Sequence, residues 1–404
     1  MKIQVLAPHF EPDSAPTGEF MSAIVNNLGD LGHELHVVTA LPWYRQHAVE
    51  EGWGGSLTRT EKRPWGEIKR VHPFPTDKTN IPARAAAFAG FTAIGLGAAV
   101  TDRFSPDVVF AMSPPLSLGV AGWLAAKRRG VPFVFNIQDV FPDVAIETGT
   151  ITSPRVISVA KKLEKFVYDQ ADVVTVLSEE MQRNVEGKSD SETEIIPNFV
   201  DISTFEPMPK ENSYRKEFGL EGKRVVMYCG NVGFSQSIEL LADAAREMTD
   251  IEDLVFVVNG GGSAIGEVRR RSVGLDNFKI IPYQPVERVP EVLAAADVHV
   301  IPLRQGLAWS SVPSKLYKIL AVQRPVIASV DEGTEVGRVV LDAGAGHAIP
   351  PDVSAPLAAS LRAILSSEDE MAAMGARGRE WVEEWTTPRR AAESYEALFE
   401  RLIS

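Results

Sequence analysis

Short apolar runs alternate along this chain with longer segments in which apolar residues recur at helical spacing. Residues 18–31 have this helical spacing, and they follow directly on an apolar run that opens the chain. Apolar runs separated by helices are typical of parallel sheets that are covered on both faces. In the first half of the chain, the runs predict strands at 2–7, 34–39, 107–112, 133–137, 173–177 and 194–196.

After Asp201 the chain becomes rich in proline and charge, which marks a domain boundary. The alternation then restarts, and beyond about residue 353 the pattern is purely helical. The strands predicted here are 224–229, 254–258, 278–281, 298–301 and 326–328. We therefore expect an α/β protein with two doubly wound, Rossmann-like domains, 1–203 and 204–385. A C-terminal helix over 386–404 is expected to return to the first domain. Ligands bind beyond the carboxyl ends of such strands, and two such edges can face each other across a cleft.

Composition supports two domains and narrows the partners. The 404 residues are too many for one ordinary core, and 45% hydrophobic with 24% charged residues is typical of globular proteins. A net charge of −13 argues against nucleic acid as the main partner. Two basic clusters remain, at 127–129 and 269–271. Both fit solvated helix faces, and the first also fits anionic lipid head groups.

Neither the cysteine content nor the apolar segments indicate an extracytoplasmic protein. Cys229 is the single cysteine, which excludes an internal disulfide and fits a buried hydrophobe in a reducing compartment. The first residues read as a strand rather than as a signal peptide. Residues 85–100 are apolar but short for a bilayer span, so we expect a buried or membrane-surface helix. We predict a cytoplasmic location, with peripheral contact to the inner face of the cytoplasmic membrane.

Glycine-containing loops follow several of the predicted strands. Gly18 ends the loop 8–19, where backbone N–H groups at a helix N-terminus would suit a phosphate. The segments 229–233 and 258–262 repeat this arrangement in the second domain. Close approach of backbone to a ligand and plain structural turns both explain these glycines.

Residues 302–318 have the most informative pattern for anion binding. Pro313 suits the first turn of a helix, and Ser311 could cap that helix. Free N–H groups there, with Lys315 one turn in, would suit a diphosphate. A solvated helix face is the alternative explanation of the lysine.

An ordered set of loose motifs resembles the retaining glycosyltransferases of family 4, which have the GT-B fold. Residues 196–201 (IPNFVD) resemble the step that closes the family's first domain, and 297–302 and 375–381 resemble two of its later motifs. The closest subgroup contains transferases similar to the colanic-acid fucosyltransferase and related exopolysaccharide and O-antigen amino-sugar transferases. Its motifs are similar to residues 32–40, 113–115, 137–139, 230–236 and 312–316.

The resemblance implies metal-independent transfer of a sugar from a nucleoside diphosphate, with no cofactor and with retention at the anomeric carbon. The second domain would hold the donor and the first domain the acceptor. The residues in catalytic positions are Gln138, Asp139 and Lys315. Those in donor-binding positions are Gly18, Gly230, Asn231, Gln236, Gly261, Arg304, Ser311, Val312, Pro313 and Lys318. Those on the acceptor side are Glu19, Ser113 and Pro114.

The chain also departs from the family pattern. Asn231 and Gln236 occupy the positions where many members have an Arg and a Lys on the diphosphate. Ser310 and Lys318 replace the usual pair of glutamates, the second of which grips the donor ribose. Positive charge for the leaving diphosphate must then come from Lys315, Arg304 or Lys318, together with helix N-termini.

Three functions therefore stay open at the level of sequence. The first is a transferase acting on a lipid-linked saccharide in cell-surface polysaccharide synthesis. The others are a nucleotide-sugar epimerase of the same fold and a non-catalytic protein that binds a sugar nucleotide. The sequence does not specify the base, the sugar, the acceptor or the oligomeric state.

Overall fold

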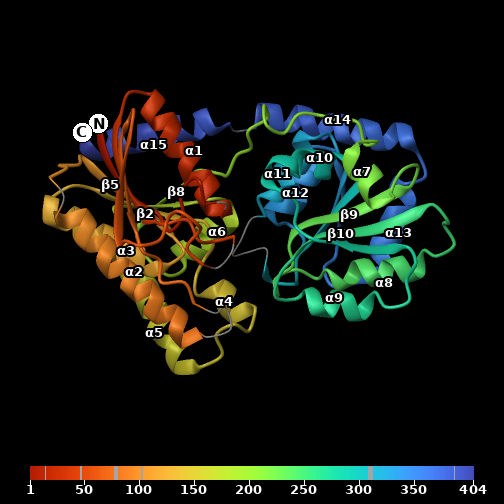
Figure 1. Cartoon of the computed structure of the whole chain (residues 1–404), viewed down its shortest axis with the longest axis horizontal. Helices are drawn as coiled ribbons and strands as arrows, with labels where there is room; N and C mark the ends of the chain where they lie inside the picture. The colour runs from red at the N-terminus through yellow and green to blue at the C-terminus, as the bar shows by residue number, and fades with distance from the viewer. Residues whose placement is uncertain (14, 46–47, 77–80, 102, 308–312, 386) are drawn as a thin grey trace. The chain divides into compact units, whose positions relative to one another are not determined.

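The computed structural model describes residues 1–404 apart from 14, 46–47, 77–80, 102, 308–312 and 386. The described chain forms two compact units, each built around its own sheet (Figure 1). The first unit comprises Met1–Asn198 with Pro388–Ser404, and the second comprises Phe199–Thr387. The sequence places these boundaries after residues 203 and 385, a few residues from the positions in the structure.

The sheet of the first unit has eight strands in the order β3-β4-β2-β1-β5-β6-β7-β8. All neighbouring pairs are parallel except β3 with β4. The strands are β1 (Lys2–Leu6), β2 (Glu34–Ala40), β3 (Thr58–Arg63), β4 (Gly66–Val71), β5 (Val108–Ser113), β6 (Phe133–Ile137), β7 (Val173–Val176) and β8 (Glu192–Ile195).

The hairpin of β3 and β4 is absent from the sequence-based prediction. Strand β3 reads TRTEKR, it lies at the edge of the sheet, and none of its residues is buried. A polar edge strand has no apolar run to detect, and its charges protect the edge from pairing with other chains. Strand β3 therefore adds one antiparallel pair to a sheet that is otherwise parallel, as predicted.

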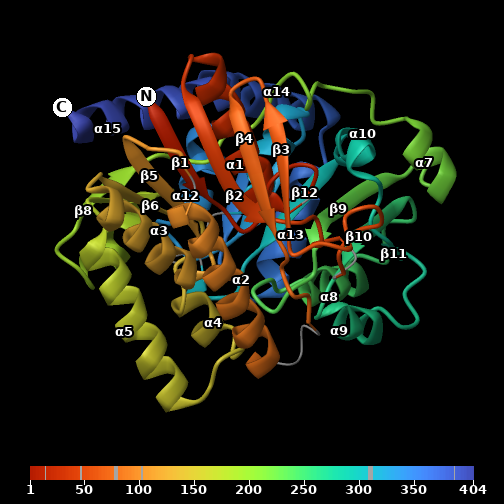
Figure 2. The same cartoon turned by 60° about the vertical axis from the view of Figure 1, so that its left-hand side comes forward.

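Helices cover both faces of the first sheet. They are α1 (Pro16–Asp30), α2 (Ile81–Thr101), α3 (Leu116–Arg129), α4 (Asp143–Glu147), α5 (Pro154–Gln170), α6 (Glu179–Glu186) and α15 (Pro388–Ile403). Helix α2 packs on α3, and α3 packs on α5, as Figure 2 shows. Gly119 and Gly122 of α3 leave room for the rings of Phe135 and Phe133 on β6. The face on which α3 packs is therefore filled by aromatic side chains.

The C-terminal helix α15 packs beside α1 on the other face of this sheet. Strand residues alternate between faces, and Phe110 of β5 points to this side. Its ring centroid lies 4.8 Å from that of Tyr395 and 5.5 Å from that of Phe399. His33 and Glu396 form an ion pair at 2.7 Å that ties α15 to the loop after α1. The last helix of the chain is thus part of the first unit's core.

The second unit has a six-stranded parallel sheet in the order β11-β10-β9-β12-β13-β14. Its strands are β9 (Arg224–Asn231), β10 (Leu254–Gly261), β11 (Phe278–Ile281), β12 (Val298–Pro302), β13 (Val326–Ser329) and β14 (Gly346–Ile349). Its helices are α7 (Ser213–Phe218), α8 (Glu239–Glu247), α9 (Ile265–Arg271), α10 (Val289–Ala294), α11 (Lys315–Ala321), α12 (Glu335–Asp342), α13 (Ser354–Ile364) and α14 (Glu368–Glu384), with a 3-10 turn at Val286–Arg288. The predicted α/β class with two Rossmann-like units and a helical tail is confirmed.

The apolar segment 85–100 lies within α2, whose Phe91, Ala98 and Ala99 are buried. Among the described residues, the chain has no helix with the length and apolar content that a membrane span requires. Helix α2 is therefore a covering helix of the first sheet.

Candidate functional site

Lys315 is the principal cation at the carboxyl edge of the second sheet. Its ammonium donates a hydrogen bond of 2.7 Å to the hydroxyl of Tyr228, and it lies 4.0 Å from the centre of that ring. The Tyr228 hydroxyl in turn donates to the carbonyl of Asn231. Burial lowers the pKa of Lys315 to about 8. A buried ammonium is thus fixed directly beneath the loop that follows β9.

The end of β9 comes close to Lys315 because residue 230 is a glycine. Gly230 has φ 134°, and a Cβ at this position would lie 3.2 Å from the ammonium nitrogen. Any side chain would both strain the backbone and press on the lysine. Gly230 therefore leaves the approach to Lys315 open.

The Gly260–Gly262 run has a structural role at two of its three positions. A Cβ on Gly260 would lie 2.0 Å from the carbonyl oxygen of Gly230, and one on Gly262 would lie 2.4 Å from that of Val232. Gly260 thus allows the ends of β9 and β10 to pair closely, and Gly262 allows the loops that follow them to touch. Gly261 differs, because a Cβ there would lie 3.4 Å from the ring of Tyr283.

Tyr283 follows β11 and was not singled out from the sequence. Its hydroxyl donates to the carbonyl of Gly261 at 2.7 Å and to the side-chain oxygen of Asn231 at 3.4 Å. Its side chain is 57% exposed although it is a large aromatic group. Its exposed ring thus lies over the predicted donor residues Asn231 and Gly261. A tyrosine two residues after a strand in the donor domain is the sequence signal that could have identified it.

Gln236 and Arg304 stabilise the loop after β9 by using their own polar groups. Gln236 accepts from the Gly233 amide at 2.9 Å and donates to Ser235 at 2.7 Å. The Arg304 guanidinium is paired with Glu239 at 2.6 Å and donates to the Phe234 carbonyl. The prediction that Arg304 supplies charge to a diphosphate is weakened, because Glu239 already balances that charge.

The predicted helix around Pro313 begins later than the sequence suggests. Helix α11 starts at Lys315, so Pro313 precedes it and Lys315 is its first residue rather than one turn in. Ser311 and Val312 lie outside the described residues. Lys318, one turn further along, has its ammonium 5.2 Å from the centre of the Phe205 ring.

In the first unit, the loop after β1 packs tightly against the start of α1. A Cβ on Gly18 would lie 2.9 Å from that of His9, so this glycine is needed for packing. His9 Nδ1 and the Asp13 carboxylate are 2.7 Å apart, and Asp13 also accepts from the Tyr44 amide at 3.1 Å. The predicted diphosphate contact at Gly18 has no further support here.

Trp43 and Tyr44 extend this cluster and were missed by sequence reasoning. The His9 ring stacks on Trp43 at 5.6 Å and meets Tyr44 edge-on at 5.3 Å. Burial and then the charges of Asp13, Asp139 and Glu19 raise the pKa of the Tyr44 hydroxyl. The predicted residues Asp139 and Glu19 therefore lie near the same tyrosine. Adjacent aromatic residues directly after a buried strand were the available signal.

Gln138 is held in a buried hydrogen-bond network, and its predicted catalytic role stays a prediction. Its amide nitrogen donates to Asn136 at 2.9 Å and its oxygen accepts from Asn198 at 3.0 Å. Asn136 then donates to Thr175 at 3.0 Å and to the hydroxyl of Tyr395 at 2.9 Å. Each end of this buried amide has one partner within the protein, so these bonds fix the position of the Gln138 side chain.

The two predicted acceptor residues that follow β5 differ in exposure. Ser113 is fully buried, and its backbone carbonyl accepts a hydrogen bond of 3.2 Å from the backbone N–H of Gln138. The Ser113 side chain is therefore closed off from solvent, and the predicted place of Ser113 on the acceptor side stays a prediction. Pro114 is half-buried and precedes α3.

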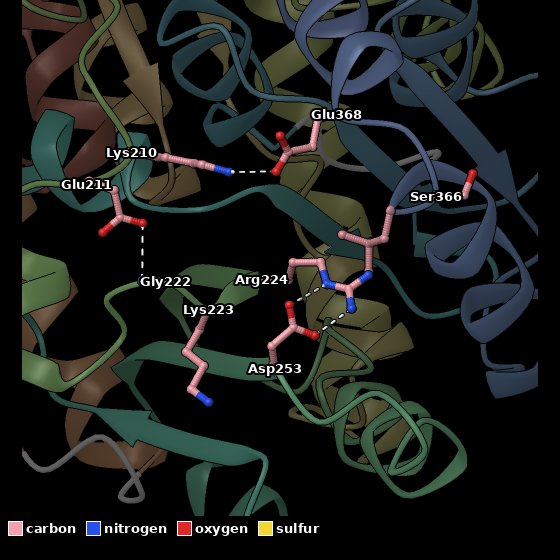
Figure 3. A pocket seen from close by; sticks show the side chains of 9 residues that line it. Lys210, Glu211, Gly222, Lys223, Arg224, Asp253, Ser366 and Glu368 are labelled. Atoms are coloured by element: carbon pink, nitrogen blue, oxygen red, sulfur yellow. Dashed lines mark hydrogen bonds and ion pairs between the residues drawn. The ribbon is translucent and has the colours of Figure 1, made fainter.

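A cavity of 460 Å³ in the second unit lies at the opposite edge of the sheet, where β9 begins (Figure 3). Arg224 pairs there with Asp253 at 2.5 Å, and Lys210 pairs with Asp297 at 2.7 Å. These cations are balanced by carboxylates, and the ligand-binding edge of a parallel sheet is the other one. This cavity is therefore not the candidate site.

Neither the lone thiol nor a metal cluster offers a second reactive centre. Burial raises the pKa of Cys229 to about 11, which keeps it a neutral thiol. Within the described ranges, no group of three or more His, Cys, Asp or Glu side chains is arranged to hold a metal ion.

Two family models match the chain, one in each unit. Residues 17–198 match the model described as a glycosyl transferase 4-like domain. Residues 223–367 match the model described as glycosyl transferases group 1. The chain is also similar to the putative colanic acid biosynthesis glycosyl transferase WcaI of Escherichia coli K12. The two are 27% identical over 350 residues, which is 84% of this chain and 86% of that protein.

Solved structures with the same fold include two proteins that align over nearly the whole chain. Sucrose-phosphate synthase from Thermosynechococcus elongatus aligns with a TM-score of 0.75 at 18% identity, over 100% of this chain and 99% of that one. HepE from Anabaena, in complex with UDP-glucose, aligns with a TM-score of 0.72 at 14% identity, over 100% of both chains. At these identities the likeness establishes the fold.

Proposed function

Because the chain is a glycosyltransferase, with a glycosyl transferase 4-like domain and a glycosyl transferases group 1 domain, we propose that it transfers a sugar with retention from a nucleoside diphosphate to a lipid-linked saccharide. The second unit holds the donor, and the first unit binds the acceptor. The product belongs to a cell-surface polysaccharide. The relative named for colanic acid biosynthesis supports this product class.

The observation that supports donor binding most directly is the state of Lys315. Its ammonium is buried, and among the described residues no carboxylate lies within ion-pair distance of it. A buried charge without a counter-charge is costly, and a bound anion removes that cost. A diphosphate next to Gly230 supplies such an anion. HepE, which has this fold, was solved with UDP-glucose.

Lys315 then acts on the leaving group. During transfer the bond from the anomeric carbon to the diphosphate oxygen breaks, and a bond from that carbon to the acceptor oxygen forms on the same face. A leaving phosphate oxygen accepts the acceptor's hydroxyl proton. Lys315 stabilises the charge that develops on the diphosphate, and removal of one such preorganised donor costs about 10²–10³ in rate. The reaction proposed here needs no metal ion and no carboxylate nucleophile.

The first unit has a surface that suits an anionic membrane, where a lipid-linked acceptor would be held. Val156 and Val159 of α5 are 47% and 67% exposed. Lys161, Lys162 and Lys165 lie on the same helix around a shallow cavity of 530 Å³. Exposed apolar residues next to lysines are favourable at a lipid interface.

The sequence placed this contact at residues 85–100 and 123–129. At the end of α3, Trp123 meets Phe166 of α5 edge-on at 5.1 Å, and the Lys127 ammonium lies 4.8 Å from the centre of the Trp123 ring. The basic end of α3 and the exposed part of α5 therefore form one surface, called the α3/α5 surface below. The cytoplasmic location and the peripheral contact remain proposals.

The test is incubation with a panel of UDP- and GDP-sugars, with and without lipid-linked saccharides. Acceptor-dependent release of nucleotide supports transfer, acceptor-free isomerisation of the donor indicates an epimerase, and binding without turnover indicates a non-catalytic protein.

The variant Lys315→Ala is expected to lose at least about 10²-fold in turnover. Lys223→Ala removes a lysine at the opposite edge of the same sheet (Figure 3) and serves as the matched control. Equal loss in both variants contradicts the role of Lys315.

A further inference from the structure

The loops after β1, β2 and β6 bring aromatic rings and carboxylates together at one edge of the first sheet. His9, Trp43 and Tyr44 supply the rings, and Asp13 supplies a buried carboxylate that contacts two of them. None of these four residues was assigned a role by the sequence. They are called the aromatic cluster below.

The aromatic cluster is held in place by hydrogen bonds from beneath. The Asp13 side chain is fully buried, and it fixes both the His9 ring and the Tyr44 backbone. Arg70 is also fully buried, and its guanidinium donates to the carbonyl of Phe10 in the loop after β1 and to that of Ala40 at the end of β2. These hydrogen bonds hold the rings in place before a ligand binds. Binding therefore does not include the cost of ordering the rings.

His9 keeps one nitrogen available. Its Nδ1 is engaged by Asp13, which fixes the tautomer that presents Nε2 on the other side of the ring. Within the part of the chain that the structure describes, Nε2 makes no hydrogen bond, and the His9 side chain is 12% exposed. A hydroxyl group of a ligand can therefore form a hydrogen bond with Nε2.

The charge around the aromatic cluster is acidic. Besides burial, which is the largest cause, the negative charges of Asp13, Asp139 and Glu19 raise the pKa of the Tyr44 hydroxyl, so the three carboxylates lie near it. Arg70, the cation beneath the loop, is already paired with Glu61 at 2.6 Å. An anionic ligand would be repelled here, whereas a neutral or cationic ligand would not.

We propose that the aromatic cluster is the subsite for the terminal sugar of the acceptor, and that it selects a neutral or amino sugar over a uronic acid or a phosphorylated sugar. The inference rests on the proposed function, because it concerns the acceptor of that transfer. The apolar face of the sugar lies on Trp43, and a sugar hydroxyl forms a hydrogen bond with His9 Nε2. Rings provide apolar contact with little loss of side-chain entropy.

Three methyl glycosides test the proposal on the full chain by saturation-transfer NMR. They are methyl glucoside, methyl glucosaminide and methyl glucuronide at slightly acidic pH, where the amine is protonated and the uronate is ionised. The glucuronide is expected to bind at least about tenfold more weakly than the other two. The variant Trp43→Ala is expected to weaken the two favoured ligands about tenfold, and His9→Gln is expected to weaken them as well. Glu19→Gln is expected to reduce the difference in affinity between the glucuronide and the other two glycosides.

Trp123→Ala removes a half-buried tryptophan on α3 and is the matched control, expected to leave glycoside binding unchanged. UDP binding is measured for every variant, because it distinguishes a failure of the proposed subsite from a failure of the proposed donor binding. If UDP binds and glycoside binding is absent, is equal for the three ligands or is insensitive to Trp43→Ala, the subsite is wrong and the transferase stands. If the glycosides respond as expected and UDP and GDP fail to bind, the subsite stands and the donor assignment fails. If Trp43→Ala loses both glycoside binding and UDP binding, the result for His9→Gln decides. This variant must weaken glycoside binding and leave UDP binding unchanged.

Discussion

At the scale of single residues, Lys315 differs from Arg304 and Arg224 in whether a carboxylate balances its charge. Arg304 has Glu239 as its counter-charge, and Arg224 has Asp253. Lys315 instead donates to a neutral tyrosine hydroxyl, and burial lowers its pKa to about 8. This difference decides which of the candidate cations is available to a diphosphate.

The Lys315 pKa gives a pH dependence of nucleotide binding. A bound diphosphate favours the ammonium, so binding raises this pKa and takes up a proton wherever free Lys315 is partly neutral. The affinity for UDP is therefore expected to fall as the pH rises through about 8, by up to about tenfold per pH unit. Calorimetric titrations between about pH 7 and about pH 9 avoid the titration of the terminal phosphate near pH 6.

The substitution Lys315→Arg is the control for this dependence. A guanidinium stays protonated across the range, so the variant is expected to bind UDP with little change between about pH 7 and about pH 9. A slope that persists in Lys315→Arg would assign the titration to another group. Lys315→Ala is expected to weaken UDP binding by about ten- to a hundredfold at neutral pH.

At the scale of elements, the buried amides connect three parts of the first unit. Asn136 on β6 contacts Tyr395 of α15 and also Gln138, and Gln138 contacts Asn198. Asn198 is the last residue of the unit before the chain enters the second, and α15 begins where the chain returns. The network thus fixes the end of β6, from which Asp139 follows.

Removal of Asn136 is expected to loosen the elements that it joins. Asn136→Ala leaves Gln138 and Tyr395 with unpaired buried groups, and it is expected to cost about 2–4 kcal/mol in the first unit. Hydrogen exchange read by mass spectrometry resolves each unit, because a chain with two units does not have to unfold in one step. Faster exchange is expected in β6 and α15 and not in the second unit.

Ser394→Ala provides the comparison on the same helix. The Ser394 side chain is exposed and bonds only within α15, so its loss is expected to cost at most about 0.5 kcal/mol. Equal protection of β6 in Asn136→Ala and in the native chain would show that the amide network does not support this strand.

At the scale of the whole molecule, charge is unevenly distributed. The chain has a net charge of −13, yet the α3/α5 surface gathers Lys127, Lys161, Lys162 and Lys165. The other basic cluster, on α9, is paired: Arg271 meets Asp243 at 3.1 Å, and Arg270 meets Glu267. The α9 cluster therefore fits the solvated helix face that the sequence predicts. On the α3/α5 surface Lys165 pairs with Asp169 at 3.1 Å, and this surface remains the one proposed to meet anionic lipid.

Co-sedimentation with vesicles that contain phosphatidylglycerol tests the α3/α5 surface. Binding is expected to weaken as salt is raised, because charges near a membrane are screened within a Debye length. The double substitution Lys161→Glu with Lys162→Glu is expected to lower binding at least about tenfold. Arg269→Glu with Arg270→Glu makes the same change of charge on α9 and is expected to have little effect. Equal losses in the two variants would indicate a general effect of net charge.

The sequence determined the class of fold and the positions of most strands, because buried parallel strands are continuous apolar runs that stand out locally. It also indicated the glycosyltransferase activity, through an ordered set of motifs. It missed the hairpin of β3 and β4 and the edge strand β14, and it set the start of α11 too early. The three missed strands contain no continuous apolar run.

Only the tertiary structure decided what individual polar residues do. Gln138 is hydrogen-bonded to Asn136 and to the distant Asn198. Arg304 is paired with Glu239, which is also distant in sequence. Lys315 differs from other helix lysines only because Tyr228 and Gly230 enclose it. Hydrogen-bond partners and burial depend on the packing of distant segments, so the sequence could nominate these side chains but could not assign their roles.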